Sequence, residues 1–205
     1  MKLYYTPGAC SLSPHIILNE LAIVHETEAV DIPTHTTESG RNFFEINDKG
    51  YVPALLLDSG DILTEGTAII QYLADLKPEK ELIPKPGTLS RARVQEWIGF
   101  ISTEIHKPLG SLLYPSTDLT SRNNTYEKID KRLLLTERKV SGSYITGEAF
   151  CVADAYLFAV LNWTKLPFFD TGIKLENYPK LNSLYQRIRS RPAVSYTLNK
   201  EGLTV

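Results

Sequence analysis

A proline-dense segment at residues 77–88 separates two parts of the chain that differ in hydrophobic periodicity. Before it, short apolar runs alternate with helical patterns in the order β-α-β-α-β-β-α. After it, the apolar residues recur at helical spacing. Because prolines this dense stop helices and stiffen a connection, we expect a domain boundary here. The sequence predicts an α/β domain with a mixed sheet at residues 1–77, a linker at 78–88 and an all-helical domain at 89–205.

The expected elements follow from local patterns. Strands are expected at residues 2–5, 25–31, 54–58 and 62–63, and helices from Ser13, over 41–46 and over 64–76. In the second part, helices are expected at 89–113, 123–140, 152–164, 178–189 and 193–199. The helix at 152–164 is apolar on nearly all sides, so we expect it at the centre of the core. Pro108 is expected to bend the helix at 89–113, because proline removes an intrahelical hydrogen bond.

Composition narrows the class of protein. The chain has 205 residues, 42% of them hydrophobic, which is enough for a sizeable core. Its net charge of −2 gives it none of the basic character typical of nucleic-acid binding. No apolar run approaches the roughly 20 residues that span a bilayer, and no signal-peptide pattern is present. The two cysteines form no disulfide framework or zinc motif, so we expect a reducing, cytoplasmic location without a metal or membrane partner.

Cys10 is the first candidate for chemistry. It follows a short strand and a Pro-Gly turn, and it precedes Ser13-Pro14, a pair that favours a helix start. The positive end of a helix dipole stabilises a thiolate, either of the protein or of a ligand. The alternative is that Cys10 is a small buried hydrophobic residue. The spacing resembles a C-x-x-C redox motif that lacks its second cysteine, which excludes dithiol cycling within the motif.

Two further features are ambiguous on their own. A cis peptide at Val52-Pro53 would expose backbone groups to an extended peptide, but the proline can equally be one that simply leads into a strand. Glu65-Gly66 begins a helix, where a carboxylate and free N–H groups can hold both ends of an amino-acid zwitterion. The plainer alternative is that Glu65 only interacts with the helix dipole.

The helical part offers polar residues on one helix face and a helix start. Gly99, Thr103 and His106 share a face of the helix at 89–113, although a histidine there is commonly solvated or structural. Cys151 precedes the helix at 152–164, and Asp154 follows three residues later, as in a capping box. We interpret Cys151 as structural, with the box only half filled, because sulfur accepts hydrogen bonds less well than a hydroxyl.

Five segments together resemble a known family: residues 5–11, 49–55, 63–69, 103–108 and 150–158. In this order and spacing they resemble the glutathione S-transferases, most closely the bacterial beta class. The resemblance implies a thioredoxin-like N-terminal domain, an all-helical C-terminal domain and a cytoplasmic homodimer. It also implies detoxification by conjugation of glutathione to hydrophobic electrophiles, with glutathione as co-substrate and no tightly bound cofactor.

The resemblance also assigns site residues. Cys10 and His106 are implied to be catalytic, with Cys10 beside the glutathione sulfur and His106 stabilising charge near it. The residues implied to bind glutathione are Cys10, Ser11, His35, Tyr51, Val52, Pro53, Glu65, Gly66, Gly99, Thr103, Glu104, His106 and Lys107. An apolar and aromatic wall at residues 109–114 and 162–169 is expected to take the electrophile.

Three positions depart from the family's common pattern. His35 replaces a lysine that pairs with the glycyl carboxylate, and Gly99 replaces an asparagine, which predicts weaker and more pH-dependent binding of glutathione. Cys151 replaces a capping Ser or Thr, at a cost of about 1 kcal/mol. Two alternative functions remain open: thiol–disulfide exchange by Cys10 with glutathione, and a non-enzymatic binding or regulatory protein on the same fold.

Overall fold

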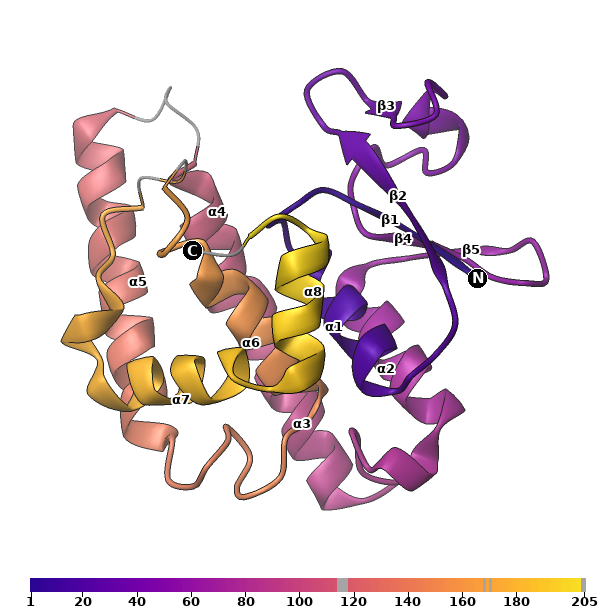
Figure 1. Ribbon diagram of the computed structural model, residues 1–205. Helices are drawn as coiled ribbons and strands as arrows, with labels where there is room; N and C mark the ends of the chain where they lie inside the picture. Colours follow the sequence, from indigo (N-terminus) through magenta and orange to yellow (C-terminus); the bar gives the residue numbers. More distant parts are fainter. Residues whose placement is uncertain (114–117, 168, 170, 204–205) are drawn as a thin grey trace.

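The computed structural model describes residues 1–113, 118–167, 169 and 171–203. Figure 1 shows a twisted sheet beside a body of helices, with α1 and α2 packed between the sheet and that body. The five strands have the order β3-β2-β1-β4-β5. They are β1 Lys2–Tyr5, β2 Glu26–Asp31, β3 Thr36–Thr37, β4 Ala54–Leu56 and β5 Ile62–Thr64.

The sheet is mixed, as predicted. β1 pairs with β2 in parallel and with β4 in antiparallel, and β4 and β5 form the expected hairpin. Strand β3 was not expected, because its two residues lie in a polar stretch without a strand pattern. The helix expected at 41–46 is only a 3₁₀ turn at Phe43–Glu45.

Helix α1 (Leu12–Glu20) joins the two parts of the molecule. It packs against α2 (Gly66–Leu76) and against α6 and α8 of the helical body, and residues 12–18 are all buried. The predicted start at Ser13 is wrong, because the helix begins at Leu12 with Ser11 in the cap position. The Ser13 hydroxyl is buried and has no hydrogen-bond partner among the described residues.

The remaining helices follow the prediction closely. They are α3 Leu89–Phe100, α4 Lys107–Ser111, α5 Leu119–Lys139, α6 Val152–Asn162, α7 Pro179–Arg189 and α8 Pro192–Lys200, with 3₁₀ turns at Pro78–Lys80 and Leu175–Asn177. Every residue of α6 is buried, which confirms its central position. The capping box at its start is formed by both partners, including the Cys151 sulfur, so the prediction of a half-filled box is wrong.

A π-helical segment, Ile101–His106, lies between α3 and α4, directly before Pro108. The backbone N–H of Lys107 donates to the carbonyl of Ser102, five residues back. Proline offers no N–H and crowds the carbonyl four residues before it, so a wider turn at this point accommodates Pro108. The single helix expected at 89–113 is therefore interrupted at the turn that carries His106.

The described residues contain neither a membrane-spanning helix nor a cluster of metal-binding side chains. None of the helices they form is long and apolar enough to cross a bilayer. The same part of the chain contains no group of three or more His, Cys, Asp or Glu side chains placed to hold a metal ion.

Candidate active site

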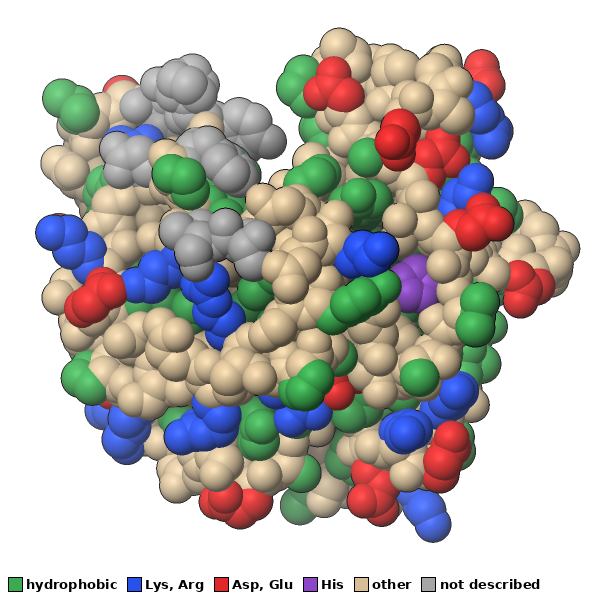
Figure 2. Space-filling model, viewed as in Figure 1, with side chains coloured by type: hydrophobic (Ala, Val, Ile, Leu, Met, Phe, Trp, Pro, Cys, Tyr) green, Lys and Arg blue, Asp and Glu red, His purple; other side chains and the backbone are tan. Residues whose placement is uncertain are grey.

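Cys10 meets the segment before β4. It lies just ahead of the first turn of α1, and its Sγ donates to the backbone carbonyl of Val52 at 3.5 Å. The Val52-Pro53 peptide is cis, which is one of the two alternatives that the sequence left open. Two segments 42 residues apart thus come together at one sulfur atom. In Figure 1 the loop from β1 to α1 runs toward the helical body, and Figure 2 shows a hollow between that body and the loops of the sheet.

The Cys10 side chain is a thiol in this setting. Burial raises the pKa of Cys10 to about 11, and the nearby negative charge of Glu65 acts in the same direction. The backbone N–H groups of Cys10 and Ser11 oppose this rise but do not cancel it. Of the two thiolates that the helix start could stabilise, the raised pKa of Cys10 favours that of a ligand over that of Cys10 itself.

Ser11 organises the loop between β1 and α1. Its hydroxyl is buried, donates to the Thr6 carbonyl at 3.2 Å and accepts from the Thr6 N–H at 3.1 Å. Both hydrogen bonds stay within the β1–α1 loop. That Ser11 supplies hydrogen bonds to glutathione stays a prediction; here its hydroxyl bonds within the loop, and its backbone N–H is directed toward Cys10.

The loop before Val52 is fixed by a buried asparagine. The Asn47 side chain donates to the Tyr51 carbonyl at 2.7 Å and accepts from the Lys49 N–H at 3.2 Å. Gly50 has a φ of +70°, and a Cβ there would lie 2.6 Å from a ring carbon of Phe44, so only glycine fits. The Tyr51 side chain is exposed.

Helix α2 begins against Pro53. A Cβ on Gly66 would lie 3.3 Å from Cγ of Pro53, so the first turn of α2 closely approaches the cis proline. Glu65 occupies the cap position with a φ of 66°, a conformation that is rare for residues other than glycine and is commonly found at functional sites. Its carboxylate is exposed and accepts from Lys49 Nζ at 2.8 Å.

His106 is held by two aromatic side chains of the central helix and its end. Its Nδ1 lies 2.6 Å from the hydroxyl of Tyr156, and its ring centroid lies 5.0 Å from that of Trp163. Burial lowers the pKa of His106 to about 4, and the charge of Lys107 adds to this effect. His106 is therefore neutral at pH 7, so it can stabilise a sulfur anion only by an N–H and not by a full positive charge.

The helical body also holds the backbone of the cysteine loop. The Trp163 indole N–H donates to the Gly8 carbonyl at 2.8 Å, and the Gly8 N–H donates to Glu201 at 2.9 Å. The other carboxylate oxygen of Glu201 lies 2.7 Å from Nδ1 of His15. Tyr156 and Glu201 received no site role from the sequence, which placed Trp163 only within the expected apolar wall. The only available signal was that Tyr156 and Trp163 lie seven residues apart, and so on one face, of an apolar helix.

Comparison with known proteins decides the family. The glutathione S-transferase N-terminal domain model matches residues 8–76, and the C-terminal domain model matches residues 103–201. The glutathione S-transferase GstA of Escherichia coli O157:H7 is 40% identical over 204 residues, which cover 99% of this chain and 100% of that protein. The chain belongs to the glutathione S-transferase family.

Solved structures of glutathione S-transferases superimpose closely on this one. A glutathione transferase from Methylococcus capsulatus is 45% identical, with a TM-score of 0.95 and 99% of each chain covered. The bacterial beta-class enzyme of Sphingomonas chungbukensis and a sphingomonad glutathione S-transferase complexed with glutathione are 38% and 39% identical, each with a TM-score of 0.92 and full coverage of both chains. The expected fold, a thioredoxin-like N-terminal domain with a helical C-terminal domain, is confirmed.

Several residues of this glutathione S-transferase that are expected to bind glutathione contact other residues of the chain. Glu104 pairs with Nε of Arg132 on α5 at 2.5 Å, and the Thr103 hydroxyl donates to the Gly99 carbonyl of its own helix at 3.1 Å. His35 has a φ of 51° and packs against Phe44, with its Nδ1 buried and unpartnered among the described residues.

The expected apolar wall of this family member is divided between the core and the surface: Leu113 and Phe169 are only partly buried, and Pro167 is exposed. Leu109, Leu112 and Leu166 are buried, so they offer little surface to a second substrate. Tyr114 and Phe168 lie outside the described residues.

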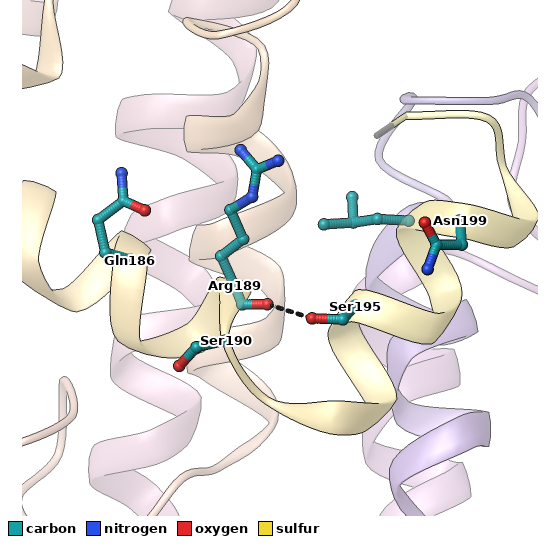
Figure 3. Close-up of a pocket in the computed structure, with 6 residues that line it drawn as sticks. Gln186, Arg189, Ser190, Ser195 and Asn199 are labelled. Atoms are coloured by element: carbon teal, nitrogen blue, oxygen red, sulfur yellow. Dashed lines mark hydrogen bonds between the residues drawn. The ribbon is translucent and has the colours of Figure 1, made fainter. Parts of the chain in front are cut away.

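Two cavities lie away from the residues around Cys10. Figure 3 shows one of about 320 Å³ between α7 and α8, where the Ser195 hydroxyl donates to the Arg189 carbonyl at 2.9 Å. A second cavity, of about 550 Å³, lies between α5 and the segment that ends at Tyr178. Neither cavity is lined by a residue that the sequence analysis assigned to glutathione.

Proposed function

We propose that this chain conjugates glutathione to hydrophobic electrophiles. The observation that carries the proposal is the convergence of the Cys10 sulfur, the cis Val52-Pro53 segment and the start of α2. In this proposal residues 1–77 bind glutathione, 78–88 link the domains, and 89–205 form the electrophile site.

The geometry supports a binding mode for the cysteinyl and γ-glutamyl parts of the tripeptide. The Val52 backbone would pair with the cysteinyl residue beside Cys10. Glu65 would take the γ-glutamyl ammonium, and the N–H groups at Gly66 would take the neighbouring carboxylate, because a helix N-terminus favours anions. Tyr51, Pro53, Gly99, Thr103, Glu104 and Lys107 remain expected contacts on the strength of the family resemblance.

Activation would come from stabilising the glutathione sulfur as an anion. A free thiol ionises near pH 8.5, so lowering its pKa by about two units makes the thiolate dominant at pH 7. The Cys10 thiol, protonated because its pKa is about 11, can donate a hydrogen bond to that anion. Neutral His106, held by Tyr156, can offer an N–H.

Two observations favour conjugation over the two alternative functions. Thiol–disulfide exchange requires Cys10 as a thiolate, which its raised pKa opposes. A purely binding protein would not need the cysteine, the cis proline and the acidic helix start together, and all three are present.

The proposal is tested by calorimetric titration with glutathione and by the rate of conjugation to a chlorodinitrobenzene. We expect saturable binding and a glutathione-dependent rate well above the uncatalysed reaction. Intact mass before and after dithiothreitol shows whether Cys10 carries a glutathione adduct. Binding without conjugation would support the non-enzymatic alternative, and no binding would contradict the proposal altogether.

The proposal extends to the assembly and the location of the protein. We propose that the protein is a cytoplasmic homodimer, as the family resemblance implies. Light scattering after size exclusion should then give twice the chain mass of 23.1 kDa.

Replacing His35 by lysine is expected to tighten glutathione binding at pH 7.5 by about three- to tenfold. A permanently charged side chain adds a charge-assisted hydrogen bond to the glycyl carboxylate, which is worth about 1 kcal/mol more than a neutral one. Titration calorimetry of wild type and His35→Lys measures the change. His35→Gln, which adds no charge, is the control and should not bind more tightly. Equal affinities for all three proteins would remove His35 from the site.

A further inference from the structure

Lys49 lies where the proposed ligand has to bind. Its Nζ donates to Oε1 of Glu65 at 2.8 Å and to the hydroxyl of Thr64 at 2.9 Å. Both acceptors stand at the end of β5 and the start of α2, beside the cis proline. We propose that Lys49 is an intramolecular competitor that occupies Glu65 until the ammonium of an α-amino acid group displaces it. This inference rests on the proposed function, because it takes Glu65 as the receptor for the γ-glutamyl end.

The chemistry of the two ammonium groups is the same. Lysine Nζ and an α-ammonium are both compact cations with three N–H donors, and both require oxygen acceptors. The Glu65 carboxylate and the Thr64 hydroxyl supply such acceptors within hydrogen-bond distance of one cation. A ligand ammonium that pairs with Glu65 therefore competes with Lys49 for the same carboxylate.

Only the lysine side chain has to move. The backbone of Lys49 is held through its N–H by buried Asn47, and the Glu65 carbonyl accepts from the N–H groups of Ala68 and Ile69 in α2. The lysine side chain itself is 48% exposed and its partner is 65% exposed. An ion pair this exposed contributes little, so a ligand can displace it.

Breaking the Lys49–Glu65 ion pair lowers the observed affinity for the ligand. The ligand gains its contact to Glu65 only after the existing ion pair is lost, so the observed affinity is lower than the site alone would give. The competitor also discriminates between ligands, because a peptide without a free α-ammonium cannot replace the lysine at the carboxylate. Lys49 is thus a specificity-determining residue, and its removal should tighten binding of ligands that carry the ammonium.

The test compares wild type with Lys49→Met and with Lys131→Met by titration calorimetry at low ionic strength. Lys131 pairs with Glu127 on exposed α5 at 3.9 Å, so its replacement removes the same charge far from Glu65. We expect Lys49→Met to bind glutathione two- to fivefold more tightly than wild type, and Lys131→Met to match wild type. With N-acetylglutathione, whose α-nitrogen carries no charge, Lys49→Met should show no gain.

Each outcome bears on the proposal. If wild type binds glutathione and Lys49→Met binds it equally or more weakly, the proposal that Lys49 competes for Glu65 is wrong. The proposed function is unaffected by that result. An equal gain with N-acetylglutathione would also overturn competition by Lys49, because the effect would then not depend on the ammonium. A wild-type protein that does not bind glutathione would instead overturn the proposed function. Lys49→Gln should reproduce the effect of Lys49→Met, which shows that it comes from loss of the charge.

Discussion

Replacing Asp154 by alanine is expected to lower the free energy of unfolding by about 3–5 kcal/mol. The carboxylate is fully buried at the start of α6 and accepts from the N–H of Cys151 at 2.9 Å and from the N–H of Ile145 at 2.8 Å. Each buried donor left without a partner costs about 1–3 kcal/mol, and the loss of the helix cap adds to this. For a chain of this size the melting temperature should fall by about 10 °C.

Urea unfolding followed by circular dichroism measures this change, and Asp118 offers a matched control. Asp118 caps α5 through an oxygen that accepts from the Ser121 N–H at 3.0 Å, but it is exposed. Asp118→Ala should therefore cost only about 1 kcal/mol. Asp154→Asn keeps one oxygen acceptor and should fall between the two. Similar losses for both alanine variants would contradict the importance of burial.

Replacing Cys10 by alanine is expected to lower conjugation by no more than about tenfold, and to abolish whatever glutathione-dependent disulfide reduction the wild type shows. Because burial raises the pKa of Cys10 to about 11, its side chain is predominantly a thiol at pH 7, so its contribution to conjugation is a hydrogen bond. A hydrogen bond of this kind contributes about 0.5–1.5 kcal/mol, which corresponds to at most about tenfold in rate. Disulfide exchange, in contrast, needs the sulfur atom itself.

Both reactions are measured on the same preparation, with Cys151→Ser as the control. Cys151 is buried at the start of α6, and serine can act as a cap there, so both activities should match wild type. A loss of conjugation of several hundredfold in Cys10→Ala would show that Cys10 is the activating group. Retained disulfide reduction would show that another group carries that reaction.

The parts of the site that follow from short local patterns could be predicted. The order of strands and helices, apart from the two-residue β3, and the acidic start of α2 depend on residues close together in the chain. The local pattern left the Val52-Pro53 peptide ambiguous between cis and an ordinary strand-leading proline. The role of Ser11 depends on a different kind of information. Its hydroxyl bonds to the backbone of Thr6, and nothing in the sequence distinguishes that partner from a ligand.

The protonation states could not be predicted because they depend on burial. Cys10 and His106 both have the neighbours that their sequence context suggests, yet desolvation raises the pKa of the thiol and lowers that of the imidazole. The His106 ring packs against Tyr156 and Trp163, whose positions are set by the packing of α6. A sequence pattern can predict which titratable groups lie near the site, but not how far each group is exposed to solvent.

Gly8 stands two residues before Cys10 in the N-terminal domain, yet its N–H and its carbonyl both bind side chains of the C-terminal domain. The backbone of the turn before Cys10 is therefore held by the helical domain as well as by the strand that precedes it. Any rotation of one half against the other would have to carry this turn with it or break both hydrogen bonds. These two hydrogen bonds, and not the linker between the domains, therefore fix the distance from the Cys10 sulfur to a substrate bound by the helical domain.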